Sequence, residues 1–251
     1  MTRINVLCLL LACLIVTLYM TNVGMTQEDA SLVLYLTFDD AGEPKDLSPK
    51  GSPIASYIKP ADVVEGIKDN AWAFDQSTCV LLDAQTFNDA FQKSTFSVWL
   101  KEPDKDGLIY EEGGSSHGFA VTLVKGAVQF ATRSGGTQTT LSADYPDDND
   151  WHFITAVFDK GMRLYIDGEL MEEKPNVAGI SGHSDEMGIG KENGASSGNV
   201  TPKFTGIMDE FRITRRGLTT EEVQKMYEDM IRTLAVRPSG KCSTTWGGIK
   251  E

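Results

Sequence analysis

The stretch Phe204-Thr-Gly-Ile-Met-Asp-Glu-Phe-Arg-Ile213 contains the clearest strand pattern of the chain. Apolar side chains recur along it with a mostly two-residue period, which is typical of a half-buried strand. The period slips once near Gly206, which predicts a local irregularity there. Asp209 stands in the middle of this apolar pattern, and a carboxylate in that position must be exposed, accept hydrogen bonds or hold a cation.

A short helix is predicted directly after this strand. Thr219 and Glu222 form a Thr-x-x-Glu capping box, so we expect the helix to begin at Thr219. An apolar stripe follows at helical spacing and consists of Val223, Met226, Tyr227, Met230, Ile231 and Leu234. We expect this stripe to pack against the body of the protein, because a short helix needs such contacts to persist.

Length and composition predict one domain with terminal extensions. A chain of 251 residues with 41% hydrophobic residues can bury one sizeable core. Residues 4–20 are almost entirely apolar and follow Arg3, which predicts a secretory signal over residues 1–26, with an uncleaved membrane anchor as the alternative. The domain is then expected over residues 27–235 and a tail over 236–251. Either alternative places the domain outside the cytoplasm, and only the anchor would attach it to a membrane.

The charge of the chain narrows the classes of partner. There are 36 acidic and 23 basic residues, a net charge of −13, which makes nucleic acid an improbable partner. Such a surface suits divalent cations or neutral ligands better than phosphates. Loss of the signal would leave Cys79 and Cys242, which can form a disulfide in an exported protein if the fold brings them together. The alternative, which we prefer, is a buried free thiol at Cys79, because this residue lies in an apolar strand.

The region before the helix has the pattern of an all-β sandwich. Short runs rich in β-branched and aromatic residues alternate with Gly, Pro, Asp and Asn. The clearest predicted strands are Leu32–Phe38, Trp72–Phe74, Cys79–Leu82, Thr95–Lys101, Gly107–Tyr110, Phe119–Val124, Val128–Arg133, His152–Asp159, Met162–Ile166 and Phe204–Ile213. Tight hairpin turns are predicted at Val124–Ala127, at Phe158–Gly161 and at Asp167-Gly168.

Two long polar segments are candidate binding loops, Asp144–Asp150 and Gly179–Val200, because loops on a rigid scaffold often carry binding residues. The candidate ligand-binding residues in them are Tyr145, Asp148, Asn193 and Asn199.

Five segments in order give the chain a resemblance to the laminin-G-like jelly-roll domains of the concanavalin A-like lectin and glucanase superfamily. They are Leu32–Asp40, Gly66–Asp75, Thr95–Leu100, Trp151–Gly168 and Gly206–Val223. The resemblance covers roughly residues 31 to 232. It implies two antiparallel, curved sheets packed face to face, with the first and last strands adjacent and the C-terminal helix lying over an edge.

The resemblance also implies a structural calcium ion where the first strand meets the last. Asp39 and Asp209 would be its ligands, and Asp40, Asp46 or a loop carbonyl would complete an oxygen shell. Without a metal, Asp209 is expected to accept backbone N–H bonds or to pair with Arg212, and Asp39 to cap a turn. No other cofactor is expected.

Catalysis is not expected. Glycoside hydrolases that share this fold place their acids as Glu-x-Asp-x-x-Glu or Glu-x-Asp-x-Glu, and neither pattern occurs in the sequence. The nearest match, Glu102-Pro-Asp-Lys-Asp106, has a turn composition that does not hold two carboxyls on opposite sides of a bond. We therefore expect a secreted, non-enzymatic module that binds an extracellular glycan through rim loops. The alternatives are a structural or adhesive module that binds protein and, third, a degenerate glycoside hydrolase-like domain.

Overall fold

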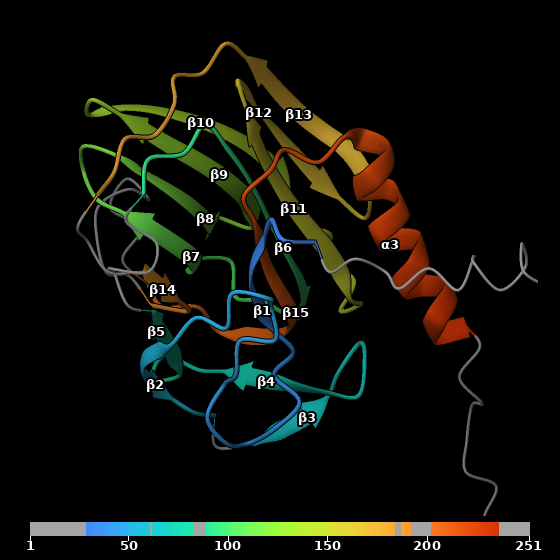
Figure 1. Ribbon diagram of the computed structural model, residues 1–251. Coiled ribbons are helices and arrows are strands. Elements are labelled where there is room, and N and C mark those ends of the chain that lie inside the picture. Colours follow the sequence, from blue (N-terminus) through green and yellow to red (C-terminus); the bar gives the residue numbers. More distant parts are fainter. Residues whose placement is uncertain (1–28, 61, 83–88, 184–186, 192–201, 236–251) are drawn as a thin grey trace, which may run out of the picture. The chain divides into compact units, whose positions relative to one another are not determined.

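Two antiparallel β-sheets pack face to face in the computed structural model, which describes residues 29–60, 62–82, 89–183, 187–191 and 202–235 (Figure 1). Within those residues the first sheet has eight strands. In spatial order they are β13 (Glu169–Pro175), β12 (Gly161–Ile166), β11 (His152–Asp159), β6 (Lys93–Lys101), β15 (Gly206–Thr214), β4 (Asn70–Phe74) and β3 (Val63–Glu65), with β1 (Leu32–Leu36) also paired to β15.

The second sheet has seven strands among the described residues. Their order is β10 (Thr137–Asp144), β9 (Ala127–Ser134), β8 (Gly118–Val124), β7 (Gly107–Gly113), β14 (Met187–Ile189), β5 (Cys79–Leu82) and β2 (Ile54–Ile58). The predicted sandwich of two antiparallel sheets is confirmed. All ten predicted strands are present with small changes at their ends, and β2, β3, β10, β13 and β14 were not predicted.

Strand β15 contains most of the stretch that was expected to close the fold. It pairs with β6 along one side, and along the other side with β4 over Gly206–Met208 and with β1 from Phe211 onward, so the first and last strands are adjacent as predicted. The register shifts between Asp209 and Arg212, and Glu210 has a positive φ of 52°. A β-bulge therefore lies at Glu210, which the sequence did not predict. Gly206, where the sequence predicted an irregularity, begins the strand with a positive φ of 139°.

The three predicted hairpin turns are confirmed. Lys125 and Gly126 both have positive φ, and so do Asp167 and Gly168, as two-residue type I′ turns require. Lys160 has a positive φ in the turn between β11 and β12. A further hairpin at Gly135-Gly136 joins β9 to β10 with the same backbone geometry.

The main core lies between the two sheets and contains Phe96, Val98 and Leu100 of β6 among its members. On the opposite face of β6, Trp99 packs with Phe153 of β11 in a second apolar cluster. Both faces of β6 are therefore covered. No helix in the described part of the chain is long and apolar enough to cross a bilayer.

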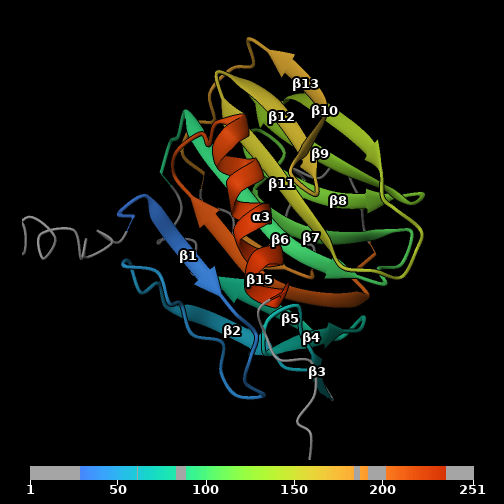
Figure 2. The same cartoon turned by 90° about the vertical axis from the view of Figure 1, so that its right-hand side faces the viewer.

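Helix α3 (Thr220–Ala235) covers the outer face of the first sheet (Figure 2). Its Tyr227 ring stacks on Trp99 with 5.7 Å between ring centroids, and Val223 packs with Val157 and Tyr165. The helix therefore lies over the middle of the sheet, on β6, β11 and β12, so the expected position over an edge was wrong. A face already lined by Trp and Phe buries more apolar area against a helix than a strand edge would.

The predicted capping box is confirmed. The Thr219 hydroxyl accepts the Glu222 N–H at 3.2 Å, and the Glu222 carboxylate accepts the Thr219 N–H at 2.8 Å. Val223 is buried, and Met226, Tyr227, Met230 and Leu234 pack on the sheet as predicted. Ile231 was wrongly placed in this stripe, since it is 40% exposed and lies on the solvent side of the helix.

Candidate functional site

Three connections at one rim of the sandwich enclose a groove of about 250 Å3. They are the turn from β6 to β7, the hairpin from β8 to β9 and the loop from β10 to β11. The lining residues are Glu102, Pro103, Asp104, Lys105, Leu123, Lys125, Gly126, Asp144, Tyr145, Pro146, Asp147 and Asn149. We call this feature the rim groove. Only the connection from β8 to β9 is a hairpin within one sheet, whereas the other two connections cross from one sheet to the other.

Backbone hydrogen bonds fasten the three connections to one another. The Gly126 N–H donates to the Lys105 carbonyl at 2.8 Å, and the Tyr145 N–H donates to the Gly126 carbonyl at 2.9 Å. The Asp106 carboxylate also accepts the Lys125 N–H at 2.9 Å. The groove walls are therefore preformed, which lowers the entropy lost when a ligand binds.

The polar lining of the rim groove is rich in carboxylates. Four acidic side chains, Glu102, Asp104, Asp144 and Asp147, face two lysines, Lys105 and Lys125. Charged side chains of both signs can exchange hydrogen bonds with hydroxyl groups, because carboxylates accept and ammonium groups donate. The excess of carboxylates opposes an anionic ligand.

Tyr145, a predicted ligand-binding residue, lines the groove but is held by the protein. Its hydroxyl donates to the Leu100 carbonyl at 2.9 Å, and its ring stands edge-on to the His152 ring with 5.3 Å between centroids. Burial raises the pKa of Tyr145, and the charges of Asp167 and Asp148 add to the increase. Tyr145 is half-buried, so it offers a ligand a fixed wall of the groove and not a free aromatic platform.

Asp148, a second predicted ligand-binding residue, lies in the same loop and contacts His152. Its Oδ1 lies 2.8 Å from His152 Nε2 and also accepts the Asp150 N–H at 2.9 Å. On the other side of the ring, His152 Nδ1 lies 2.7 Å from Oδ2 of Asp167, in the turn between β12 and β13. The hydrogen bond to His152 lowers the pKa of the Asp148 carboxyl. Asp148 therefore holds the loop in place.

His152 begins β11, and its two carboxylate partners were not predicted from the sequence. The predicted turn at Lys160 sets the register of the hairpin between β11 and β12. Extending that register away from the turn pairs Phe153 with Asp167, which places Asp167 next to His152. Asp148 stands four residues before His152, within reach of its ring. The sequence could therefore have predicted this cluster.

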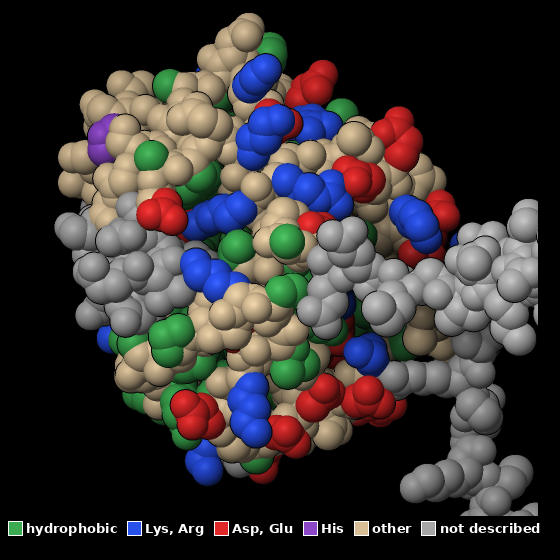
Figure 3. Space-filling model, viewed as in Figure 1, with side chains coloured by type: hydrophobic (Ala, Val, Ile, Leu, Met, Phe, Trp, Pro, Cys, Tyr) green, Lys and Arg blue, Asp and Glu red, His purple; other side chains and the backbone are tan. Residues whose placement is uncertain are grey.

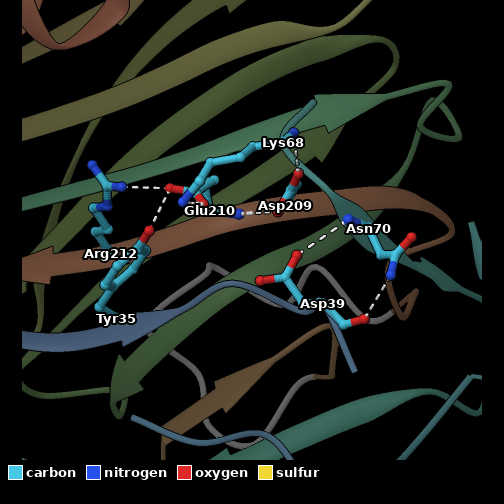
Figure 4. A network of polar contacts seen from close by, with 7 residues as sticks. All are labelled: Tyr35, Asp39, Lys68, Asn70, Asp209, Glu210 and Arg212. Atoms are coloured by element: carbon cyan, nitrogen blue, oxygen red, sulfur yellow. Dashed lines mark hydrogen bonds and ion pairs between the residues drawn. The ribbon is translucent and has the colours of Figure 1, made fainter. Parts of the chain in front are cut away.

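The predicted metal ligands Asp39 and Asp209 both bind the turn that precedes β4 (Figure 4). Asp209 Oδ2 accepts the Lys68 N–H at 3.0 Å, and Asp39 Oδ1 accepts the Asn70 N–H at 3.1 Å. Asp209 Oδ1 also accepts the N–H of Glu210 at 2.7 Å. The two carboxylates therefore bind backbone N–H groups at both ends of the segment 68–70. This segment lies where the pairing of β15 changes from β4 to β1.

Asp209 is fully buried, and this burial raises its pKa to about 8. The hydrogen bonds from Lys68 and Glu210 oppose the increase, whereas the negative charges of Glu210 and Asp39 add to it. The metal-free expectation that Asp209 accepts backbone N–H bonds is confirmed. Arg212, the alternative partner considered for Asp209, pairs with Glu210 instead.

The buried carboxylate of Glu210 is a centre of polar contacts on the same strand (Figure 4). It accepts a hydrogen bond from the Tyr35 hydroxyl at 2.6 Å, forms an ion pair with Lys68 at 3.3 Å and pairs with Arg212. These contacts join β1, the turn before β4 and β15.

The other two predicted metal ligands have structural contacts of their own. Asp46 accepts N–H groups of Tyr35 and Ser48 at 2.9 Å with Oδ1, and Ser48 and Ser52 donate to its Oδ2. Asp40 has an exposed side chain, and its carbonyl accepts the indole N–H of Trp72 at 2.8 Å. Across residues 29–60, 62–82, 89–183, 187–191 and 202–235, no three acidic, His or Cys side chains gather as a metal site would require.

Several predictions fall partly or wholly outside the described residues. These are the signal at 1–26, the tail at 236–251, Asn193, Asn199 and Cys242. Cys79 is described, and it is buried and forms no disulfide with another described residue. Its pairing with Cys242 stays a prediction, as do the domain boundaries.

The comparisons with known proteins identify the same fold over most of the chain. The binding domain of Paraclostridial Mosquitocidal Protein 1 superposes with a TM-score of 0.65 at 18% sequence identity, covering 81% of this chain and 53% of that one. The botulinum neurotoxin serotype D ligand-binding domain, in complex with N-acetylneuraminic acid, gives 0.64 at 18% identity, covering 82% and 53%. The receptor-binding domain of the botulinum neurotoxin C/D mosaic serotype gives 0.62 at 20% identity, covering 81% and 52%.

These identities are low, so the three likenesses show the fold alone. The chain also spans only about half the length of the toxin domains that it matches. No curated protein sequence matches the chain. A family model described as the concanavalin A-like lectin/glucanases superfamily matches residues 74–224, which is more than half of the chain. The chain therefore belongs to the concanavalin A-like lectin/glucanase superfamily.

Proposed function

We propose that the chain is a non-enzymatic module that binds a neutral extracellular glycan in the rim groove. The observation that carries the proposal is the groove itself, with walls fastened by backbone hydrogen bonds and a lining of hydroxyl-binding side chains around Tyr145. The binding domains among the structural neighbours support a binding role, and one of them is described in complex with N-acetylneuraminic acid.

The charge of the groove favours neutral sugars over acidic ones. Four carboxylates against two lysines oppose a ligand that carries a carboxylate or sulfate, whereas the hydroxyl groups of a neutral sugar can donate to the carboxylates. The ligand class proposed for this chain therefore differs from the N-acetylneuraminic acid named for the serotype D domain.

Catalysis is not part of the proposal. Glu102, Asp104 and Asp106 lie in the turn between β6 and β7, as the sequence predicted, and Asp106 is engaged with the Lys125 N–H. Glu102 has a positive φ of 49° and an exposed side chain. A turn of this kind does not hold two carboxyl groups across a glycosidic bond.

A glycan array on the expressed chain tests the proposal. We expect binding to neutral oligosaccharides and little to sialylated or sulfated ones. Replacing two of the four exposed groove acids, Asp104→Ala with Asp147→Ala, removes acceptors for sugar hydroxyls and should weaken binding at least tenfold, since each hydrogen bond to a charged group contributes about 1.5–3 kcal/mol. Glu65→Ala, at an exposed acid of β3 outside the groove, is the matched control and should bind as the parent does.

A protein ligand is the second candidate, and one observation favours it. All seven residues of the edge strand β13 are exposed, including Leu170 at 42% and Met171 at 48%. The face in Figure 3, however, has acidic, basic and apolar side chains interspersed, without the broad apolar patch that marks many protein interfaces. An array on which neither the parent chain nor the groove variants bind any glycan would favour the protein ligand.

We also propose a structural calcium ion beside the turn before β4, as a separate proposal. Asp39 and Asp209 would hold it, because their carboxylates flank one turn and a hard cation prefers such oxygen donors. The side chains described there supply two carboxylates, so carbonyl groups or water must complete the shell. A bound cation would offset the two neighbouring negative charges and strengthen the junction of β1, β4 and β15.

Thermal melts with calcium and with a chelator test the calcium proposal. At a calcium concentration one hundred times the Kd, stability should rise by about 2.7 kcal/mol, and Asp39→Asn should remove most of that rise. Identical melting curves of the parent chain in calcium and in chelator would rule the site out.

A further inference from the structure

We propose that His152, held between Asp148 and Asp167, is a positioning residue for the rim groove: its charged form fastens the loop from β10 to β11, and its neutral form releases that loop. The inference uses the proposed function only for its consequence on ligand binding. Its structural part concerns the loop itself, which lines the groove through Asp144, Tyr145, Pro146, Asp147 and Asn149.

Two carboxylates at once require a charged imidazole. Nε2 lies 2.8 Å from Asp148 and Nδ1 lies 2.7 Å from Asp167, so both ring nitrogens need a proton to donate. A neutral ring has one N–H, and its other nitrogen would turn a lone pair toward a carboxylate oxygen. One of the two contacts must therefore break when His152 loses its proton.

The contact to Asp148 is the one that breaks. Asp167 is fixed, because its Oδ1 accepts the Phe153 N–H at 2.8 Å and its own N–H donates to the Phe153 carbonyl at 2.9 Å. The Asp148 side chain is 50% exposed and can turn into water. The neutral ring therefore keeps its proton on Nδ1, bonded to Asp167. Residues 147–150 lose this anchor, whereas Tyr145 keeps its hydrogen bonds to Gly126 and Leu100.

The two carboxylates next to His152 both favour its charged form. Its neighbours from the loop are Asp148 and Tyr145, and its neighbour from the turn after β12 is Asp167. Farther out lies Tyr227 of α3. Burial raises the pKa of its hydroxyl, and the negative charges of Asp167 and of Glu169 in β13 add to the increase. Burial by itself lowers the pKa of His152, but the hydrogen bonds to Asp148 and Asp167 outweigh it and raise the pKa above its ordinary value.

The raised pKa of His152 determines whether the loop is more stable at low or at high pH. A histidine with a raised pKa in the fold contributes stability that is complete below its unfolded pKa of about 6.5 and is lost as the pH rises through the folded value. The loop should therefore be ordered in mildly acidic solution and become mobile as the pH rises through the raised pKa of His152. Ligand affinity should follow, because a mobile groove wall must be ordered again on binding.

Nuclear magnetic resonance on the expressed chain tests the inference. The imidazole C–H resonance of His152 reports its titration, and backbone order parameters of residues 147–150 report the loop in the same sample. We expect order parameters near 0.85 at pH 5.5, falling below about 0.6 with the midpoint of the His152 titration. Equal loop order on both sides of that midpoint would overturn the inference.

The substitution Asp148→Asn distinguishes this mechanism from general loosening of the protein. The amide oxygen of Asn can accept from the charged ring, and its NH2 group can donate to the neutral ring, so the contact survives the titration. We expect the pH response of loop order to vanish in Asp148→Asn and the pKa of His152 to fall. A loop that still loses order at the His152 midpoint in this variant would also contradict the inference. His117→Gln, which changes a histidine in the turn between β7 and β8, is the matched control and should titrate as the parent does.

Glycan affinity, measured over the same pH range with a neutral oligosaccharide from the array, separates the two proposals. About tenfold weaker binding above the His152 midpoint in the parent chain, and no such change in Asp148→Asn, would support the link to the groove. A loop that responds to pH in a chain that binds no glycan supports the positioning role and contradicts the proposed function. A chain that binds glycan but whose loop order does not change with pH supports the proposed function and contradicts the positioning role.

Discussion

Replacing Arg215 with Met should destabilise the chain by about 3–5 kcal/mol, the largest effect that we expect from a single substitution. Two hydrogen bonds of 3.0 and 2.7 Å join the Arg215 guanidinium to the Glu112 carboxylate, which is 1% exposed. Glu112 belongs to β7 of the second sheet, and Arg215 directly follows β15 of the first. The pair therefore ties the two layers together.

The cost arises mainly from the acid that remains. Without Arg215, the Glu112 carboxylate would stay buried without this counter-charge, and the protein must either bear the desolvation penalty or protonate the acid. Arg215 also donates to Ser94 at 2.9 Å and lies over the Phe91 ring at 4.2 Å from its centroid. Both contacts would be lost too.

Urea unfolding of matched variants measures the effect. Arg216→Met is the control, because Arg216 pairs with Glu222 at the surface, where such pairs contribute about 0–1 kcal/mol. The double variant Arg215→Met with Glu112→Leu should recover most of the loss, since it removes the buried charge together with its partner. An Arg215→Met variant that unfolds at the same urea concentration as the parent would show that the pair does not join the sheets.

Replacing Asp209 with Ala should cost about 3 kcal/mol. The buried N–H group of Glu210 and the partly buried N–H group of Lys68 would lose their acceptor, and each orphaned donor costs about 1–3 kcal/mol. Relief of the unfavourable burial of the Asp209 carboxyl reduces this cost, since its pKa is raised to about 8. The turn also packs tightly on this acid, because a Cβ at Gly66 would lie 2.5 Å from Asp209 Oδ2.

Chemical denaturation with and without a chelator separates the two roles of Asp209. In chelator, Asp209→Ala should lose about 3 kcal/mol and Asp39→Ala about 1 kcal/mol or less, because Asp39 is half-buried and accepts one N–H through its carboxylate. A loss below 1 kcal/mol for Asp209→Ala in chelator would contradict the structural role. A loss that appears only with calcium present would assign the residue to the metal alone.

The sequence predicted the fold well where physical rules are local. The hairpin at Lys125-Gly126 needs two residues with positive φ, and the capping box at Thr219 needs two residues three apart, so both could be identified from neighbouring letters. Strands β10 and β13 were missed because they are edge strands rich in Thr, Ser and Glu, with little apolar alternation. Their identity depends on pairing with β9 and β12.

The candidate site was less predictable, because its geometry depends on tertiary contacts. The loop containing Tyr145 and Asp148 was identified correctly, but the sequence gives no indication that it meets the turn at Asp104 and the hairpin at Lys125. Asp39 and Asp209 were correctly predicted to lie near one another. The turn containing Lys68 lies between them because the pairing of β15 changes from β4 to β1 at this point. No local sequence pattern predicts that change.

Chemical-shift mapping tests most directly whether a neutral glycan binds in the rim groove. The chain is titrated with an oligosaccharide identified on the array. We expect the largest amide shifts in Glu102–Lys105, in Lys125 and Gly126 and in Tyr145–Asn149, with the rest of the spectrum nearly unchanged. Shifts centred instead on β13, or on the smaller pocket of about 160 Å3 that is lined by Asp39, Asp40 and Trp72, would contradict binding in the rim groove.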